Sequence, residues 1–184
     1  MLRLHYCALL LFASLLIASC GGATVEDYAK REPAFIPEQF FKGDLEAYGV
    51  VKDRSGTVTR RFSATLKGSW KDGKGLLAER FEFDDGEIQY RNWHLIPQQQ
   101  SGGVRRYGAS AEDVVGEATV RVSGNAGFFR YTLKVPYGDR QINVDVDDRM
   151  YLVNERILIA ESDLTKWGFD VGEIILTIIK PHTP

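Results

Sequence analysis

Cysteine and histidine are scarce in this 184-residue chain, which contains two cysteines and three histidines. Both cysteines, Cys7 and Cys20, lie within the first twenty residues, so the remaining residues can form neither a disulfide nor a cysteine-based metal site. Beyond that segment only His94 and His182 remain, too few for a histidine-rich zinc site. We therefore expect no metal and no other cofactor.

An excess of charge of one sign is also missing. The chain has 23 Lys and Arg against 25 Asp and Glu, a formal net charge of −2. Because a protein that grips phosphates needs a basic face, we expect no nucleic-acid partner. With 44% hydrophobic and 26% charged residues the composition is that of a globular protein, and the length suits one domain.

No catalytic constellation is recognisable either. The sequence lacks a nucleophile-elbow pattern, and no helix is expected after the glycine-rich turn at residues 124–127, as a phosphate-binding loop would need. The adjacent carboxylates Asp84-Asp85 and Asp147-Asp148 do not converge on a strand, because neighbouring residues point to opposite faces. We therefore expect a protein that is not an enzyme.

The N-terminus carries a targeting signal. An apolar run from Tyr6 to Ile17 follows the basic residue Arg3. This run is too short to span a bilayer as a helix but has the length of a signal-peptide core. It ends in Ile17-Ala18-Ser19-Cys20, which resembles the bacterial lipobox, where a signal peptidase cuts before a cysteine that carries diacylglycerol.

These features predict three segments: a lipoprotein signal peptide at residues 1–19, a lipidated N-terminus and tether at 20–41, and a β-barrel domain at 42–184. Lipidation of Cys20 would anchor the protein in a membrane, and glycine at position 21 resembles the signal for the outer membrane, facing the periplasm. The alternatives are an ordinary secretory signal that happens to contain Cys20 and a retained membrane helix.

From residue 43 onward, alternating apolar and polar residues recur between short turn signals, a pattern typical of an all-β protein. Helical turns are expected only near Glu38 and at 111–115 and 162–167. We expect strands at residues 43–52, 57–70, 76–84, 87–96, 104–110, 116–123, 128–135, 140–148, 150–153, 156–161 and 172–180.

Consecutive antiparallel strands with short turns favour a single up-and-down barrel, because closure removes exposed sheet edges. A membrane-spanning barrel is the alternative, but charged residues such as Arg80 and Glu82 on one face are incompatible with lipid. A closed barrel of eight or more strands has room for a small ligand.

One hairpin can be registered from the sequence. Asp85-Gly86 predicts a two-residue type I′ turn, which places Phe83 opposite Ile88 and Phe81 opposite Tyr90 on one face. The same face continues with Glu79 opposite Asn92, whereas the other face carries Gln89, Arg91 and Trp93. A carboxylate such as Glu79 on an apolar face must be paired, protonated or in contact with a cavity.

Several segments together resemble an uncharacterised family of proteobacterial lipoproteins, domain of unknown function 3833. They are residues 41–49, 53–62, 83–87 with Arg91 and Trp93, 112–116, 124–126 and 147–148. The resemblance implies a lipocalin-like barrel, in a family whose members often appear beside enzymes that modify fatty acyl chains. The chain departs from the family pattern at Arg149, where tryptophan is usual, and at Ala160-Glu161, where Asn-Arg is usual.

These observations favour a lipid-anchored periplasmic protein that holds an acyl chain or a similar apolar molecule in its barrel. Two alternatives stay open: a structural lipoprotein with a packed barrel that docks other components through its surface, and an enzyme that acts on lipid. The sequence predicts no particular protein partner. The candidate ligand-binding residues are Arg60, Glu79, Phe81, Arg91, Asn92 and Trp93.

Overall fold

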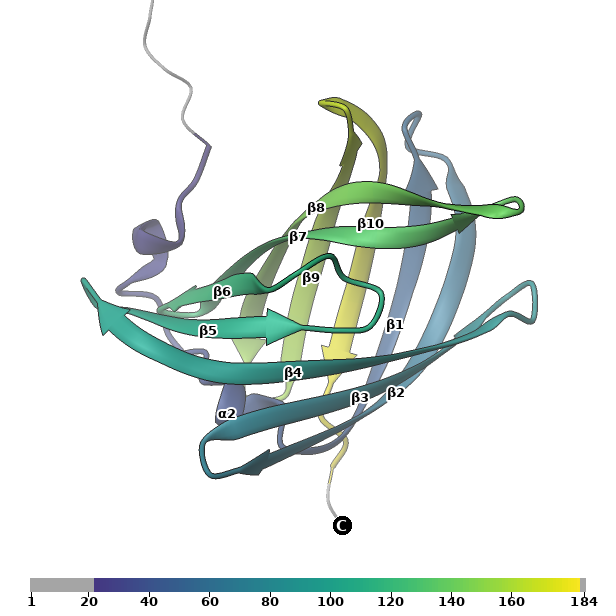
Figure 1. Cartoon of the computed structure of the whole chain (residues 1–184). Helices are drawn as coiled ribbons and strands as arrows, with labels where there is room; N and C mark the ends of the chain where they lie inside the picture. The colour runs from purple at the N-terminus through teal and green to yellow at the C-terminus, as the bar shows by residue number, and fades with distance from the viewer. Residues whose placement is uncertain (1–21, 183–184) are drawn as a thin grey trace, which may run out of the picture.

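The structure, a computed structural model, describes residues 22–182; the predicted signal peptide and Cys20 lie outside the described residues. Ten strands follow one another as an antiparallel meander, and β1 pairs with both β2 and β10, so that the sheet closes (Figure 1). This confirms the prediction of an all-β antiparallel barrel. The strands are β1 (Gly43–Asp53), β2 (Val58–Lys71), β3 (Lys74–Phe83), β4 (Ile88–Ser101), β5 (Val104–Ser110), β6 (Ala118–Ser123), β7 (Ala126–Tyr137), β8 (Arg140–Asn154), β9 (Ile157–Lys166) and β10 (Phe169–Ile179).

Two details of the strand prediction are wrong. The two strands expected at 140–148 and 150–153 are one strand, β8, and β9 continues to Lys166 through residues expected to form a helical turn. The helical turn expected near Glu38 is present as α2 (Pro37–Phe40), preceded by the 3-10 turn η1 (Val25–Tyr28). No helix within residues 22–182 is long and apolar enough to cross a membrane.

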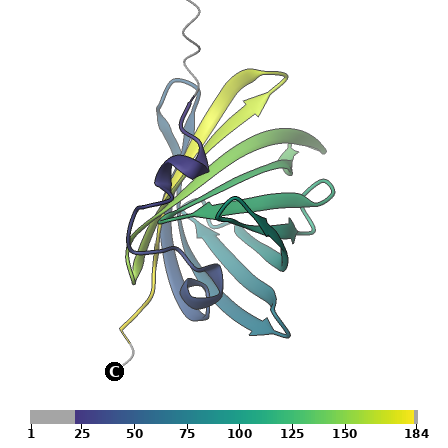
Figure 2. The same ribbon diagram turned by 90° about the vertical axis from the view of Figure 1, so that its left-hand side faces the viewer.

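The segment before β1 closes one end of the barrel (Figure 2). Phe35 has no exposed surface, and its ring lies edge-on to those of Phe40 and Phe41 at centroid distances of 6.0 and 5.8 Å. The backbone of Phe41 passes so close to β2 that a Cβ on Gly68 would lie 1.4 Å from the Phe41 carbonyl oxygen. Glycine at position 68 therefore permits the closure, and aromatic burial stabilises it.

The opposite end of the barrel is its mouth, where the turns after β1, β3, β7 and β9 lie. Between the two ends, side chains alternate along each strand between the lumen and the outer surface. In β8, Val144 and Val146 are buried whereas Asn143 and Asp145 are exposed, as the alternating sequence predicts.

The β3–β4 turn differs from its prediction. The N–H of Gly86 donates to the Phe83 carbonyl at 3.0 Å, and the N–H of Phe83 donates to the Glu87 carbonyl at 3.0 Å. Residues 84–86 thus form a three-residue loop with Gly86 at φ 86°. A type I′ turn would also need a positive φ at Asp85, which Asp85 does not have.

The extra loop residue moves β4 by one position relative to β3. Phe81 lies opposite Gln89, and Glu79 lies opposite Arg91. Phe81, Phe83 and Glu79 face the lumen as expected, but the prediction for β4 is wrong, because a shift of one residue exchanges the faces of a strand. Ile88, Tyr90 and Asn92 point outward, and Gln89, Arg91 and Trp93 point inward.

Candidate ligand-binding cavity

The barrel is hollow. A cavity of about 450 Å³ extends from Phe35 and Phe41 at the closed end to Val51, Phe83 and Val135 near the mouth. Most residues that line it are aromatic or aliphatic, and they come from the inward-facing positions of nearly every strand. The volume lies within the range of about 300–1,000 Å³ that is usual for small-molecule pockets.

Aromatic side chains shape the wall of the cavity on both sides of its middle. Toward the mouth, the Phe62 and Phe81 rings meet edge-on at 5.6 Å. Toward the closed end, Trp93 packs edge-on against Phe129 at 5.0 Å and against Tyr131 at 5.3 Å. These edge-on contacts set the orientation of the rings that line the cavity.

A few polar side chains interrupt this apolar lining about half way along the strands. Glu79 and Arg91 come from the paired strands β3 and β4, Asp148 from β8, Tyr131 from β7 and Ser162 from β9. Because these strands lie on different sides of the barrel, the polar groups form a layer across the lumen. We call these five residues the polar layer.

Arg91 is fixed by a carboxylate from the connection between β5 and β6. Its Nε lies 2.8 Å and its Nη2 2.7 Å from Oδ2 of Asp113. The connection itself is held to β7, where the N–H of Lys134 donates to the Asp113 carbonyl at 2.7 Å. The guanidinium is therefore positioned by a two-pronged, charge-assisted contact.

The pKa values of the Glu79 and Asp148 carboxyls are raised above those of ordinary carboxyl groups. Burial raises the pKa of Glu79 to about 7, and the nearby carboxylates Asp148 and Asp113 add to this, against the lowering effect of Arg91. Burial also raises the pKa of Asp148 to about 7, although its Oδ1 accepts a hydrogen bond from Ser162 Oγ at 3.1 Å. Both carboxyls retain some accessible surface, and both line the cavity. The polar layer can therefore gain or lose a proton near neutral pH.

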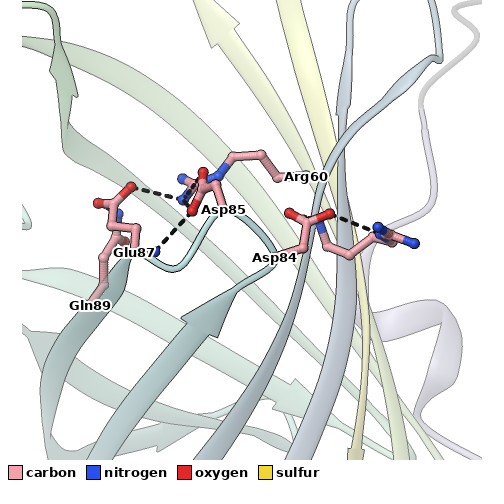
Figure 3. A network of polar contacts seen from close by, with 6 residues as sticks. Arg60, Asp84, Asp85, Glu87 and Gln89 are labelled. Carbon is pink, nitrogen blue, oxygen red and sulfur yellow. Dashed lines mark hydrogen bonds and ion pairs between the residues drawn. The ribbon is translucent and has the colours of Figure 1, made fainter.

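The mouth carries its own ionic cluster. Figure 3 shows Asp85 and Glu87 converging on Arg60, whose Nη2 lies 2.7 and 2.8 Å from their carboxylate oxygens. The Arg60 guanidinium also lies over the Phe83 ring, 3.7 Å from its centroid. Arg60 thus lies at the mouth with its charge paired to two carboxylates.

The structure brings four of the six candidate ligand-binding residues together. Glu79, Phe81, Arg91 and Trp93 line the cavity near its middle, whereas Arg60 lies at the mouth. Asn92 does not face the lumen, because the corrected register turns it outward, where its side-chain amide donates to Glu112 Oε1 at 3.4 Å. Arg91, which the predicted register turned outward, faces inward.

Sequence reasoning missed Asp148, Tyr131, Ser162 and Asp113. Asp148 shares the inward phase of β8 with Val144 and Val146, the same signal that singled out Glu79. Asp147 points outward to Arg130 at 2.7 Å, so the two adjacent carboxylates do lie on opposite faces. Among residues 22–182 no group of three or more His, Cys, Asp or Glu is arranged to hold a metal ion.

A closed antiparallel meander around an apolar cavity defines a lipocalin-like barrel. The chain belongs to the family described as protein of unknown function DUF3833, whose model matches residues 14–180. The sequence matches no curated protein.

Two solved structures share the fold. An S-type phycobiliprotein lyase, CPES, from Guillardia theta matches with a TM-score of 0.58 at 12% identity, covering 89% of this chain and all of the lyase. A protein of unknown function from the DUF3598 family of Nostoc punctiforme matches with a TM-score of 0.51 at 14% identity. That match covers 88% of this chain but about half, 53%, of the Nostoc protein.

Proposed function

We propose that the protein is a lipid-anchored periplasmic binding protein that holds one elongated apolar molecule, such as an acyl chain, inside its barrel. The observation that carries this proposal is the cavity of about 450 Å³, lined by aromatic and aliphatic side chains from one end of the barrel to the other. An apolar pocket with a few convergent polar groups is the usual form of a small-molecule site.

The hollow lumen also argues against the structural alternative, in which the barrel is packed and only its surface functions. A packed barrel would fill its centre with large side chains at the density of a protein core. Here Phe62, Phe81 and Trp93 lie along the wall and leave the centre open.

We propose binding without catalysis. Two of the cavity-lining polar groups that could act on a bound molecule are already engaged, since Arg91 contacts Asp113 and the Ser162 hydroxyl donates to Asp148. The membrane anchor and the outer-membrane location rest on the lipobox that ends at Cys20.

Native mass spectrometry of the protein purified from its own host, with extraction and identification of bound lipid, tests the proposal. We expect a single apolar molecule per chain, lost on denaturation. A chain that purifies without any ligand and fails to bind an uncharged fluorescent apolar probe would instead support the structural lipoprotein.

A further inference from the structure

The charges around the cavity are unbalanced. Only two arginines, and no lysine, are among the described residues that line it, whereas Glu79 and Asp148 are both in the polar layer. Arg91, the one cation of that layer, is bound to the Asp113 carboxylate at 2.7 Å. The single charge of Arg91 thus faces three carboxyl groups, that of Asp113 and those of Glu79 and Asp148 in the polar layer.

The second arginine does not correct the imbalance. Arg60 lies at the mouth, and its guanidinium is paired with Asp85 and Glu87 and rests on the Phe83 ring. A ligand with a carboxylate or phosphate head would therefore meet only cations that already have a carboxylate partner. It would meet two groups that repel it once they ionise.

We propose that the ligand carries a positively charged nitrogen beside its apolar chain, and that Glu79 and Asp148 hold this nitrogen in the middle of the barrel. This inference rests on the proposed binding function and specifies the class of ligand: an alkyl amine or alkylammonium amphiphile rather than a fatty acid. A buried cation requires a nearby carboxylate, and the layer supplies two.

The surroundings of the two carboxyls suit such a head group. Trp93 and Tyr131, with ring centroids 5.3 Å apart, line the cavity beside Glu79 and Asp148, and aromatic faces attract cations. Below the polar layer, Leu77, Phe129 and Phe41 line the lumen toward the closed end. This part of the lumen, between the polar layer and the closed end, is an apolar compartment into which the chain of the ligand fits.

Displacement of an uncharged fluorescent probe, N-phenyl-1-naphthylamine, tests the inference with three ligands that share one chain and differ in the head. The full chain is placed in nanodiscs of zwitterionic phosphatidylcholine, which has no net charge, with empty nanodiscs as the blank. We expect dodecyltrimethylammonium to displace the probe at a concentration about tenfold lower than dodecanoate, since about 1.4 kcal/mol, near the lower end for a close charge pair, corresponds to a factor of ten. The concentration of dodecanol that displaces the probe should lie between those of the other two ligands.

Variants connect this preference to the two carboxyls. The double variant Glu79→Gln/Asp148→Asn should reduce the preference for the cation to less than about threefold, whereas Glu82→Gln, on the outward face of β3, should retain it. If the double variant does not unfold cooperatively in urea, Asp148→Asn alone should lower the preference in the same direction.

The failures are distinguishable. If the wild type does not bind the probe or any of the three ligands, the proposed binding function is wrong. If it binds the probe but prefers dodecanoate or dodecanol, or shows no preference, binding stands and the cationic head group is wrong. An unchanged preference in the variants also overturns the role of Glu79 and Asp148.

Discussion

Replacing Glu79 by glutamine should stabilise the protein at alkaline pH and leave it almost unchanged at acidic pH. Burial raises the pKa of Glu79 from its ordinary value of 4.5 to about 7 in the folded protein. The folded state therefore binds this proton more tightly than the unfolded state. As the pH rises from about 4.5, the unfolded state releases the Glu79 proton first, and the free energy of unfolding decreases. This decrease is complete above about pH 7, where Glu79 is also ionised in the folded state.

The magnitude follows from the same two values. The difference between 4.5 and about 7 corresponds to about 3 kcal/mol, because each pKa unit is worth about 1.4 kcal/mol. Glu79→Gln keeps the shape of the side chain but cannot ionise. We expect the free energy of unfolding of the variant to exceed that of the wild type by up to about 3 kcal/mol at pH 8 and to match it within about 1 kcal/mol at pH 4.5.

Urea unfolding at the two pH values measures this effect through the midpoint and the slope of each transition. Glu82→Gln is the matched control, because Glu82 lies three residues along the same strand, is exposed and forms an ion pair with Arg80. Loss of that surface pair should cost less than about 1 kcal/mol at either pH. A Glu79→Gln variant that is equally destabilised at pH 4.5 and pH 8 would refute the conclusion that burial raises the pKa of the Glu79 carboxyl.

Three further predictions test other parts of the molecule. Phe81→Ala, on the cavity wall, should lower the affinity for an apolar probe in a fluorescence titration. In urea unfolding it should lower the free energy of unfolding much less than Phe35→Ala, which removes a fully buried ring and should cost about 3–5 kcal/mol. Equal losses of stability in the two variants would indicate a packed lumen. Gly68→Ala should destabilise the closed end, because its Cβ would lie 1.4 Å from the Phe41 carbonyl oxygen, and a urea midpoint like that of the wild type would contradict this close approach. Cys20→Ala should leave an unprocessed precursor without lipid, detectable by intact-mass measurement, and normal cleavage of this variant would disprove the lipobox.

The strand pattern was predictable because alternation with a period of two records directly which side chains face the lumen. Val144 and Val146 show this alternation in β8, and Glu79 was recognisable as a polar residue in an apolar phase. Asp148 was recognisable by the same criterion. The criterion applies to Asp148 only when it is compared with the residues two positions away, and the adjacent Asp147 obscures this pattern.

Other features were beyond the reach of local patterns. Gly86 can take a positive φ in a two-residue or a three-residue loop, so the dipeptide Asp85-Gly86 does not decide the register of β4. Asp113 lies on an irregular connection, where alternation gives no direction, and its pairing with Arg91 depends on how that connection packs against β7. The hairpin register and the main electrostatic contact of the cavity both required the three-dimensional structure.

The pairing of β1 with β10 has a consequence for the order of events during folding. Glu46 lies opposite Ile179, 133 positions later in the chain (179 − 46 = 133), so the seam of the barrel joins its first strand to its last. We expect such a distant contact to form after the intervening strands have come together, because closing a long loop costs entropy before the contact offsets it. No N-terminal fragment of the chain can enclose the lumen. We therefore expect the proposed ligand to enter a barrel that has already closed, past the mouth where Arg60 pairs with Asp85 and Glu87.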